Sequence, residues 1–184
     1  SAGYTWAEPG YTTTQPNSLM RVASVSKAFT CAAIRRPADT NQLDLDDEVF
    51  PLLGITGAAL PGQTPDSRID TVTVRQCVQH TGGWVRRVST VDPVFYTREI
   101  ARALSLPGPA SKRDVARYMY GEPLQYNPGD TTAYNSTDRY SNFGYVLLGL
   151  VVEQVTGLSF RDYLAQAVLN PLGFSNQVFV GATE

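Results

Sequence analysis

The chain has 184 residues, of which 42% are hydrophobic and 17% charged, a composition typical of one globular domain or a large part of one. Its formal net charge of −2 gives no electrostatic basis for binding nucleic acid or an anionic membrane. The longest apolar stretch, residues 145–152, is far shorter than the ~20 residues that a membrane span needs, so no span is predicted.

The first half of the chain predicts a strand end at residues 4–6, a polar loop, and then three helices. The first helix covers residues 24–36 and stops at Pro37, which lacks an N–H group and crowds the preceding turn. Two acidic residues favour a short helix start within residues 43–53. After a loop rich in Gly, Pro and Asp, a third helix is predicted over residues 72–80.

The second half predicts four more helices. One short helix is expected near residues 98–104, and a second is capped by Ser111 and runs to Tyr120. Residues 122–139 read as a long loop. Apolar residues at helical spacing then indicate a helix over residues 142–155, and Ser159 caps a last helix that runs to residue 169.

The residues with the clearest chemistry are Ser24 and Lys27, followed far downstream by Tyr140 and Asn142. Positions i and i+3 lie on one face of a helix, so Lys27 can reach Ser24. A serine activated by a lysine is a known alternative to the Ser-His-Asp arrangement. Tyr140 can relay the proton, and the Asn142 amide can hold Lys27 and a substrate carbonyl. Each motif alone is weak, because a chance S-x-x-K or Y-x-N is common.

Longer segments around these motifs resemble serine beta-lactamase-like proteins. The similar segments are residues 19–30, 41–49, 73–83, 140–145 and 170–173, which together cover nearly the whole chain. The branch that the chain resembles most is that of class C beta-lactamases and family VIII carboxylesterases, which carry tyrosine at the start of the second motif.

The resemblance implies an α+β fold of the beta-lactamase/transpeptidase type, of which this chain holds mainly the helical part. One partial domain is expected over residues 1–184, with a sheet remnant and loop in residues 1–23 and a mostly helical region in residues 24–184. Family members carry further strands with a third motif, Lys/His-x-Gly or Trp-x-Gly, and nothing after Phe174 supplies it. A continuation or a second chain is therefore expected to complete the sheet and supply a second oxyanion donor.

The implied function is a serine hydrolase that forms an acyl-enzyme on Ser24 and acts on an ester or a beta-lactam without a cofactor. Hydrolysis of D-alanyl peptides uses the same machinery and stays open. The alternative from a different class is a non-catalytic or incomplete module that keeps the fold and binds a peptide or partner chain. A periplasmic or secreted location and a cytoplasmic one both stay open.

Other candidate residues have two interpretations each. Trp84 and Tyr126 lie in loops and either line a substrate pocket or pack under those loops. His80 is either a general base or a turn residue whose ring caps the backbone before the Gly82-Gly83 pair, and we favour the turn. Cys31 and Cys77 are either buried free thiols or a disulfide pair, which would need an oxidising compartment and close Cα atoms, and we favour the free thiols. With one histidine and two isolated cysteines, no metal site is predicted.

Overall fold

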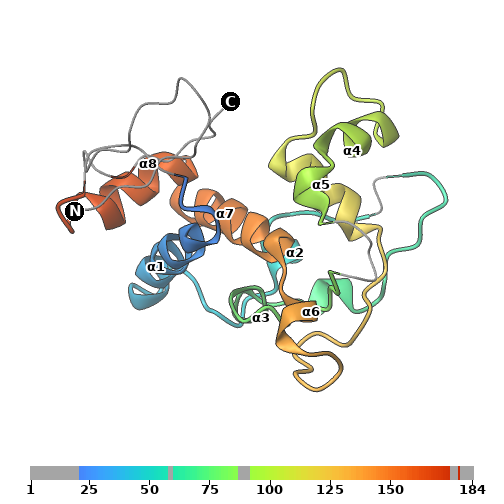
Figure 1. The fold of residues 1–184 in the computed structure, drawn as a ribbon, viewed down its shortest axis with the longest axis horizontal. Coiled ribbons are helices and arrows are strands. Elements are labelled where there is room, and N and C mark those ends of the chain that lie inside the picture. Colours follow the sequence, from blue (N-terminus) through green and yellow to red (C-terminus); the bar gives the residue numbers. More distant parts are fainter. Residues whose placement is uncertain (1–20, 58–59, 87–91, 175–177, 179–184) are drawn as a thin grey trace, which may run out of the picture.

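The computed structural model describes residues 21–57, 60–86, 92–174 and 178, which form helices joined by loops (Figure 1). Within these ranges there is no strand, only an isolated antiparallel bridge between Glu48 and Thr73. The strand expected at residues 4–6 and most of the expected sheet remnant lie outside the described residues. A largely helical region was predicted for residues 24–184, and the described part of the chain has that character.

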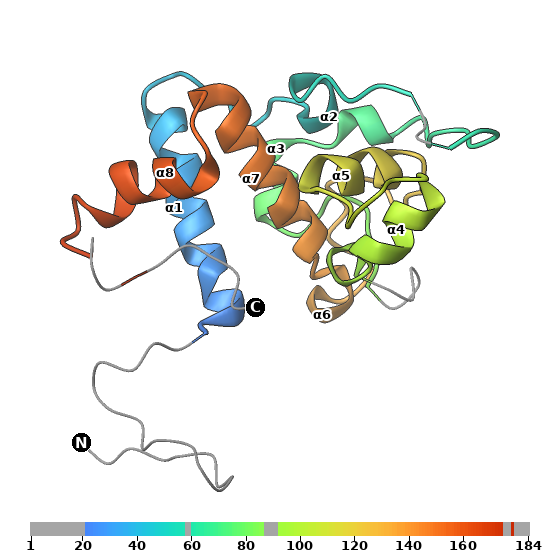
Figure 2. The same ribbon diagram turned by 90° about the horizontal axis from the view of Figure 1, so that it is seen from above.

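Helix α7 (Asn142–Thr156) forms the centre of the core. Ser141 caps its first turn by accepting a hydrogen bond from Gly144 N, and the helix ends at Gly157, whose φ of 70° few other residues adopt readily. Helices α1 and α5 pack against α7, as Figure 2 shows, and α3 and α8 contact it too. Gly144 faces α3: a Cβ at this position would lie 3.4 Å from the Cys77 carbonyl oxygen, an ordinary van der Waals distance. The buried side chains of α7 are Phe143, Leu147, Leu148, Leu150, Val151 and Val152.

Helix α1 (Ser26–Asp39) follows a 3₁₀ turn, η1 (Ala23–Val25), and it does not stop at Pro37 as predicted. Pro37 is buried in the last turn. A proline in a helix lacks one hydrogen-bond donor and crowds the carbonyl four residues earlier, but only two helical residues follow Pro37, so the distortion affects only the end of α1. The Pro37 carbonyl accepts hydrogen bonds from Gln42 N and from the Thr40 hydroxyl, which ends the helix.

Helices α2 (Val49–Leu52) and α3 (Val74–Val78) are shorter than predicted. Asp47 accepts a hydrogen bond from Asp44 N, so the acidic residues build a turn before α2 instead of its first turn. Between these helices lies η2 (Ile69–Thr71). Helix α3 begins at a capping box in which Thr73 and Gln76 bind each other's backbone N–H groups.

The next helices are η3 (Pro93–Phe95), α4 (Thr97–Ala103) and α5 (Lys112–Tyr120). The predicted cap at Ser111 is confirmed: its hydroxyl accepts from Asp114 N, and the Asp114 carboxylate accepts from Ser111 N. The prediction of a continuous loop over residues 122–139 is wrong at its end, where α6 (Ser136–Arg139) forms. Its cap is Asn135, which accepts from Asp138 N.

The chain then continues through α8 (Phe160–Leu164), which runs into the π-helical η4 (Ala165–Leu169). Ser159 caps α8 as predicted, by accepting a hydrogen bond from Asp162 N. Among the described residues, no single helix is long and apolar enough to cross a membrane. Only α7 taken together with α8 and η4 reaches that length and composition, and this pair is bent by 82°.

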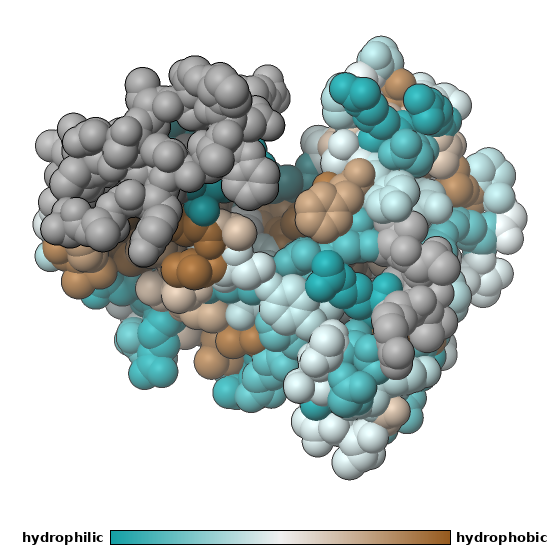
Figure 3. All heavy atoms as spheres, viewed as in Figure 1, coloured by the Kyte–Doolittle hydropathy of each residue, from teal (hydrophilic) through white to brown (hydrophobic). Residues whose placement is uncertain are grey.

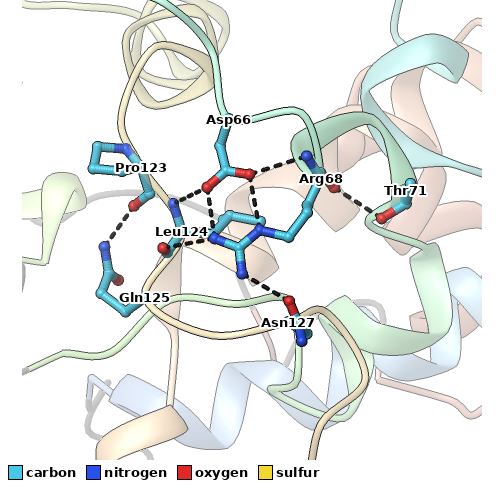
Figure 4. A network of polar contacts seen from close by, with 7 residues as sticks. All are labelled: Asp66, Arg68, Thr71, Pro123, Leu124, Gln125 and Asn127. Carbon is cyan, nitrogen blue, oxygen red and sulfur yellow. Dashed lines mark hydrogen bonds and ion pairs between the residues drawn. The ribbon is translucent and has the colours of Figure 1, made fainter.

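A polar network joins two loops that lie beside the core (Figure 4). The Asp66 carboxylate accepts hydrogen bonds from the Arg68 guanidinium and from Leu124 N, and Arg68 also donates to Asn127 and to the Leu124 carbonyl. The hydrogen bond with Arg68 holds the pKa of Asp66 at about 2, below its usual value. The network therefore anchors the loop that precedes α6.

Apolar surface on the face drawn in Figure 3 gathers near α1 and α8, whereas the half formed by α4 to α6 is mainly polar. The large apolar side chains that are exposed among the described residues include Val22 and Val25 beside the start of α1, and Leu172 and Phe174 after η4. A single exposed side chain of this kind is common on protein surfaces. Here two of them, Val22 and Val25, lie on either side of Ser24 in the sequence.

Candidate active site

Three of the predicted side chains meet at the start of α1. Lys27 Nζ lies 3.2 Å from Ser24 Oγ, and the Tyr140 hydroxyl lies 2.6 Å from the same oxygen. Ser24 is exposed and Lys27 is half-buried. The Ser24 hydroxyl is therefore in direct hydrogen-bond contact with two groups that can take or give a proton.

Local backbone structure brings Ser24 to this position. Ser24 lies in the turn η1, immediately before α1, rather than inside the helix. The preceding residue, Ala23, has a φ of 44°, a left-handed conformation that is unfavourable for alanine. Lys27 lies three residues further on, in the first turn of α1, so its side chain can return to the Ser24 hydroxyl.

Asn142 completes the group and connects it to a residue that the sequence did not indicate. Its Oδ1 accepts a hydrogen bond from Lys27 Nζ, and its Nδ2 donates to the Asp92 carboxylate. The two contacts fix the amide orientation, because only its oxygen can accept from an ammonium and only its nitrogen can donate to a carboxylate. Asp92 is 50 positions away from Asn142 in the sequence and belongs to no motif, so no local pattern could have identified it.

The sequence Tyr140-Ser141-Asn142 lies at the junction of α6 and α7. Ser141 is the buried cap of α7, and its side chain binds the helix backbone. Capping holds Ser141 in an extended conformation, with φ of −127° and ψ of 117°. Tyr140 and Asn142 flank this fixed residue: Tyr140 reaches Ser24 in η1, and Asn142 reaches Lys27 in the first turn of α1.

The electrostatic surroundings favour the phenolate form of Tyr140. Burial alone would raise the pKa of Tyr140, but the neighbouring Lys27 ammonium, the hydrogen bond with Ser24 and the charge of Arg86 together lower it. Lys27 Nζ also lies 4.6 Å from the centre of the Tyr140 ring, and the Arg86 guanidinium carbon lies 5.9 Å from it. A phenolate at this position could accept the Ser24 proton.

The two predicted aromatic residues lie in different places. Trp84 is buried, packs edge-on against Phe143, and lines a small pocket that also includes Tyr140 and Asp92. Tyr126 is buried as well and does not line that pocket; its hydroxyl donates to the His80 carbonyl at 3.2 Å. The loop-packing interpretation therefore describes Tyr126, whereas Trp84 lies at the site.

His80 is a turn residue with a φ of 58°, but its ring does not cap the backbone before Gly82 as expected. Instead, Nδ1 accepts a hydrogen bond from Ser141 N at 3.1 Å. His80 is not among the residues that hydrogen-bond Ser24 in the described part of the chain, where Lys27 and Tyr140 have that role. The sequence interpretation of a turn residue was right about the backbone and wrong about the partner of the ring.

The two cysteines are free thiols, but only Cys77 is buried as predicted. Burial raises the pKa of the Cys77 thiol to about 12, so it stays protonated at neutral pH. Cys31 is half-buried, and its sulfur lies 3.3 Å from the Tyr145 hydroxyl, which donates to the Val78 carbonyl. In the residues that the structure describes, no group of three or more His, Cys, Asp or Glu side chains could hold a metal ion.

The chain is similar to known proteins over most of its length. A family model described as beta-lactamase matches residues 2–183. The chain is 29% identical over 164 residues to protein flp of Staphylococcus aureus strain N315. The aligned region covers 89% of this chain and 28% of that protein. The chain thus spans less than a third of the length of that curated relative.

Two solved structures are similar to this chain in fold. A D-stereospecific amidohydrolase from Streptomyces sp. matches 84% of this chain and 42% of its own, with 26% identity and a TM-score of 0.58. EstCE1, described as a hydrolase with promiscuous acyltransferase activity, matches 83% of this chain and 37% of its own, with 26% identity and a TM-score of 0.59. The predicted beta-lactamase/transpeptidase-like fold is confirmed by these matches.

Proposed function

This chain belongs to the beta-lactamase family, and from that premise we propose that it carries the nucleophile of a serine hydrolase that forms an acyl-enzyme on Ser24. The observation that carries the proposal is the contact of Ser24 Oγ with both Tyr140 Oη, at 2.6 Å, and Lys27 Nζ, at 3.2 Å. Both partners can exchange a proton with the attacking hydroxyl.

In the proposed acylation step, Ser24 Oγ attacks the substrate carbonyl carbon while its proton passes to the Tyr140 oxygen. The carbonyl oxygen becomes an anion, which collapses as the bond to the leaving group breaks. The proton then moves from Tyr140 to the leaving group, so charges and protons balance. The Lys27 ammonium stabilises the Tyr140 phenolate, whose ring lies 4.6 Å from Lys27 Nζ. In deacylation, a water molecule attacks the acyl carbon and gives a proton to Tyr140; the bond to Ser24 Oγ then breaks, and Tyr140 returns the proton to Ser24 Oγ.

Asn142 has a binding role in this proposal. Its amide oxygen holds Lys27 while its nitrogen points to Asp92, so the ammonium stays beside Ser24 during the reaction. Trp84 lies in the wall of the adjoining pocket and is proposed to contact the substrate there. Tyr126 supports the site from behind through the His80 carbonyl.

An ester or a beta-lactam is the proposed substrate class, because both present an activated carbonyl to the serine. The similarity to EstCE1, which is described as a hydrolase with promiscuous acyltransferase activity, supports an acyl-transfer reaction. A second candidate is hydrolysis of an amide of a D-configured amino acid, such as a D-alanyl peptide. The similarity to a D-stereospecific amidohydrolase favours that candidate.

The test is intact-mass measurement of the protein after incubation with a fluorophosphonate and, separately, with a penicillin. We expect a single covalent adduct on the peptide that contains Ser24. A penicillin adduct together with turnover of D-alanyl peptides would favour the second candidate. Absence of both adducts in the folded, full-length protein would contradict the acyl-enzyme proposal and leave a non-catalytic binding module as the function.

A further inference from the structure

The imidazole of His80 lies behind the Tyr140-Ser141-Asn142 segment and contacts it in two ways. Its Nδ1 accepts a hydrogen bond from Ser141 N, from a residue 61 positions further along the chain. Its ring lies against Tyr140, with ring centres 4.6 Å apart, and against Tyr145, with centres 5.1 Å apart. The same side chain thus binds the backbone and one side chain of the segment that delivers Tyr140 and Asn142 to the site.

The position of the His80 ring is itself fixed by the surrounding backbone. His80 has a left-handed φ of 58° directly after α3, and its carbonyl accepts a hydrogen bond from the Tyr126 hydroxyl. The next residue, Thr81, is buried, and its N–H donates to the Gln76 carbonyl at 2.8 Å. A left-handed conformation in a residue other than glycine persists only where neighbouring contacts hold it. The structure therefore keeps the ring at one place, against Ser141.

We propose that neutral His80 is a positioning residue for the acylation reaction, because its Nδ1 accepts the Ser141 N–H and its ring supports Tyr140. The inference rests on the function proposed above and adds a residue to it. His80 does not touch Ser24 in this arrangement; it acts by fixing the backbone between Tyr140 and Asn142, the two residues that contact Ser24 and Lys27.

The hydrogen bond specifies one protonation state of the ring. A nitrogen that accepts a hydrogen bond carries no proton, so Nε2 carries the single proton of the neutral imidazole. Protonation would place an N–H on Nδ1, facing the Ser141 N–H, and the hydrogen bond would be lost. The segment would then shift, and both Tyr140 and Asn142 would move with it.

The groups around the His80 ring determine the pH at which it becomes protonated. Tyr140 before α7 and Tyr145 within α7 contact the ring, Lys27 of α1 and Arg86 lie over the Tyr140 ring, and Tyr126 binds the His80 carbonyl. Burial lowers the pKa of His80, and the Lys27 charge lowers it further, against the opposing effect of the hydrogen bond from Ser141. The neutral form is thus the form present at pH 7, and protonation occurs only below the ordinary pKa of histidine, about 6.5.

Two substitutions separate the role of the acceptor from that of the ring. His80→Asn places a carbonyl oxygen near the position of Nδ1, tolerates a left-handed backbone and does not titrate. His80→Leu has a similar volume but no acceptor. Acylation rates with an ester substrate would be measured in the full-length protein from pH 4.5 to 8, with kcat and KM determined separately.

We expect His80→Leu to lower kcat by about 10²-fold with little change in KM, since displacement of a catalytic group by about 1 Å has effects of that size. His80→Asn should keep a kcat within about tenfold of that of the natural protein. Its rate should no longer show the fall at acidic pH that protonation of His80 causes in the natural protein. The Ser141 amide resonance of the natural protein should move as His80 titrates, which tests the contact even if His80→Leu does not fold.

The inference would be overturned by an unchanged kcat in His80→Leu, or by a Ser141 resonance that is insensitive to the titration. If the natural protein forms the Ser24 adduct but His80→Leu keeps its kcat or the Ser141 resonance does not respond to pH, only the role of His80 is refuted. If no adduct forms at all, the proposed function fails, while the Ser141 resonance still reports whether His80 makes the contact.

Discussion

The Tyr140 hydroxyl lies 2.6 Å from Ser24 Oγ, although 116 positions separate the two residues in the sequence. Lys27 contacts both of them: its ammonium is 3.2 Å from Ser24 Oγ and 4.6 Å from the centre of the Tyr140 ring. The three residues form one unit that joins the start of α1 to the start of α7. Each of the first three predictions removes one member of this unit.

Ser24→Ala should abolish the covalent adduct with a fluorophosphonate, because the attacking oxygen is lost. Ser26→Ala is the matched control: it removes a neighbouring hydroxyl that starts α1 but is not among the groups that contact Tyr140 or Lys27 in the described residues. The mass of each protein after incubation distinguishes the two. An adduct that persists in Ser24→Ala and disappears in Ser26→Ala would show that the nucleophile was wrongly assigned.

Lys27→Arg should lower the rate of acylation by at least about 10²-fold, because the larger planar guanidinium keeps the positive charge but cannot take the place of Nζ between Ser24 Oγ, the Asn142 amide oxygen and the Tyr140 ring. Stability should change little, since Lys27 is half-buried and the charge is conserved. The measurement is the single-turnover acylation rate together with a thermal melt. Lys112→Arg, at an exposed position of α5, is the control and should leave the rate unchanged. A near-normal rate in Lys27→Arg would contradict the need for an ammonium at this position and would show that any positive charge there is sufficient.

Tyr140 should form a phenolate at a lower pH than an ordinary tyrosine, because Lys27 and Arg86 stabilise the charged form. The difference in tyrosinate absorbance between the natural protein and Tyr140→Phe gives its titration curve. In Lys27→Ala, that curve should move to higher pH, because the nearest positive charge is gone. Tyr140→Phe should also lower kcat by about 10²-fold or more. A titration curve that does not respond to Lys27→Ala would contradict the proposed electrostatic pairing.

Asp92→Ala should lower kcat/KM by about tenfold, because the Asn142 amide would lose the acceptor that fixes its orientation. Asp92→Asn keeps an oxygen acceptor and should have the smaller effect. Glu99→Ala serves as control: Glu99 is an exposed residue of α4 whose carboxylate pairs with Arg102. Steady-state kinetics of the three variants provides the comparison. Equal activity of Asp92→Ala and Glu99→Ala would remove Asp92 from the site.

Asp66 should contribute to acid stability through its pair with Arg68. Its pKa is about 2 in the folded chain and near 3.8 when unfolded, so the contribution is complete above pH 3.8 and is lost as the pH falls through about 2. Asp66→Ala should lower the free energy of unfolding by about 1–3 kcal/mol at pH 7, since hydrogen bonds to Arg68 and Leu124 are lost. Urea denaturation at pH 7 and at pH 2.5 measures both effects. The difference in unfolding free energy between the natural protein and Asp66→Ala should be smaller at pH 2.5 than at pH 7, because pH 2.5 lies between the unfolded and folded pKa values of Asp66. An equal difference at the two pH values would refute the linkage.

The residue sequence by itself determined the local features of this chain. The helix caps at Ser111 and Ser159 each depend on a hydroxyl and a backbone N–H a few residues away, so their spacing could be recognised without a fold. The Ser24 and Lys27 pair is equally local, at positions three residues apart. The resemblance of longer segments to the beta-lactamase family supplied what local spacing could not, the association of this pair with Tyr140 and Asn142.

Tertiary structure alone decided the contacts that join distant segments. Asp92 meets Asn142 across 50 positions and His80 meets Ser141 across 61, and neither pairing follows from spacing in the sequence. Packing also placed Pro37 inside the last turn of α1, where its intrinsic preference predicted an end. The physical reason is common to these cases: a hydrogen bond within one turn is set by the geometry of the chain, whereas a contact between segments depends on how α1, α3 and α7 pack together.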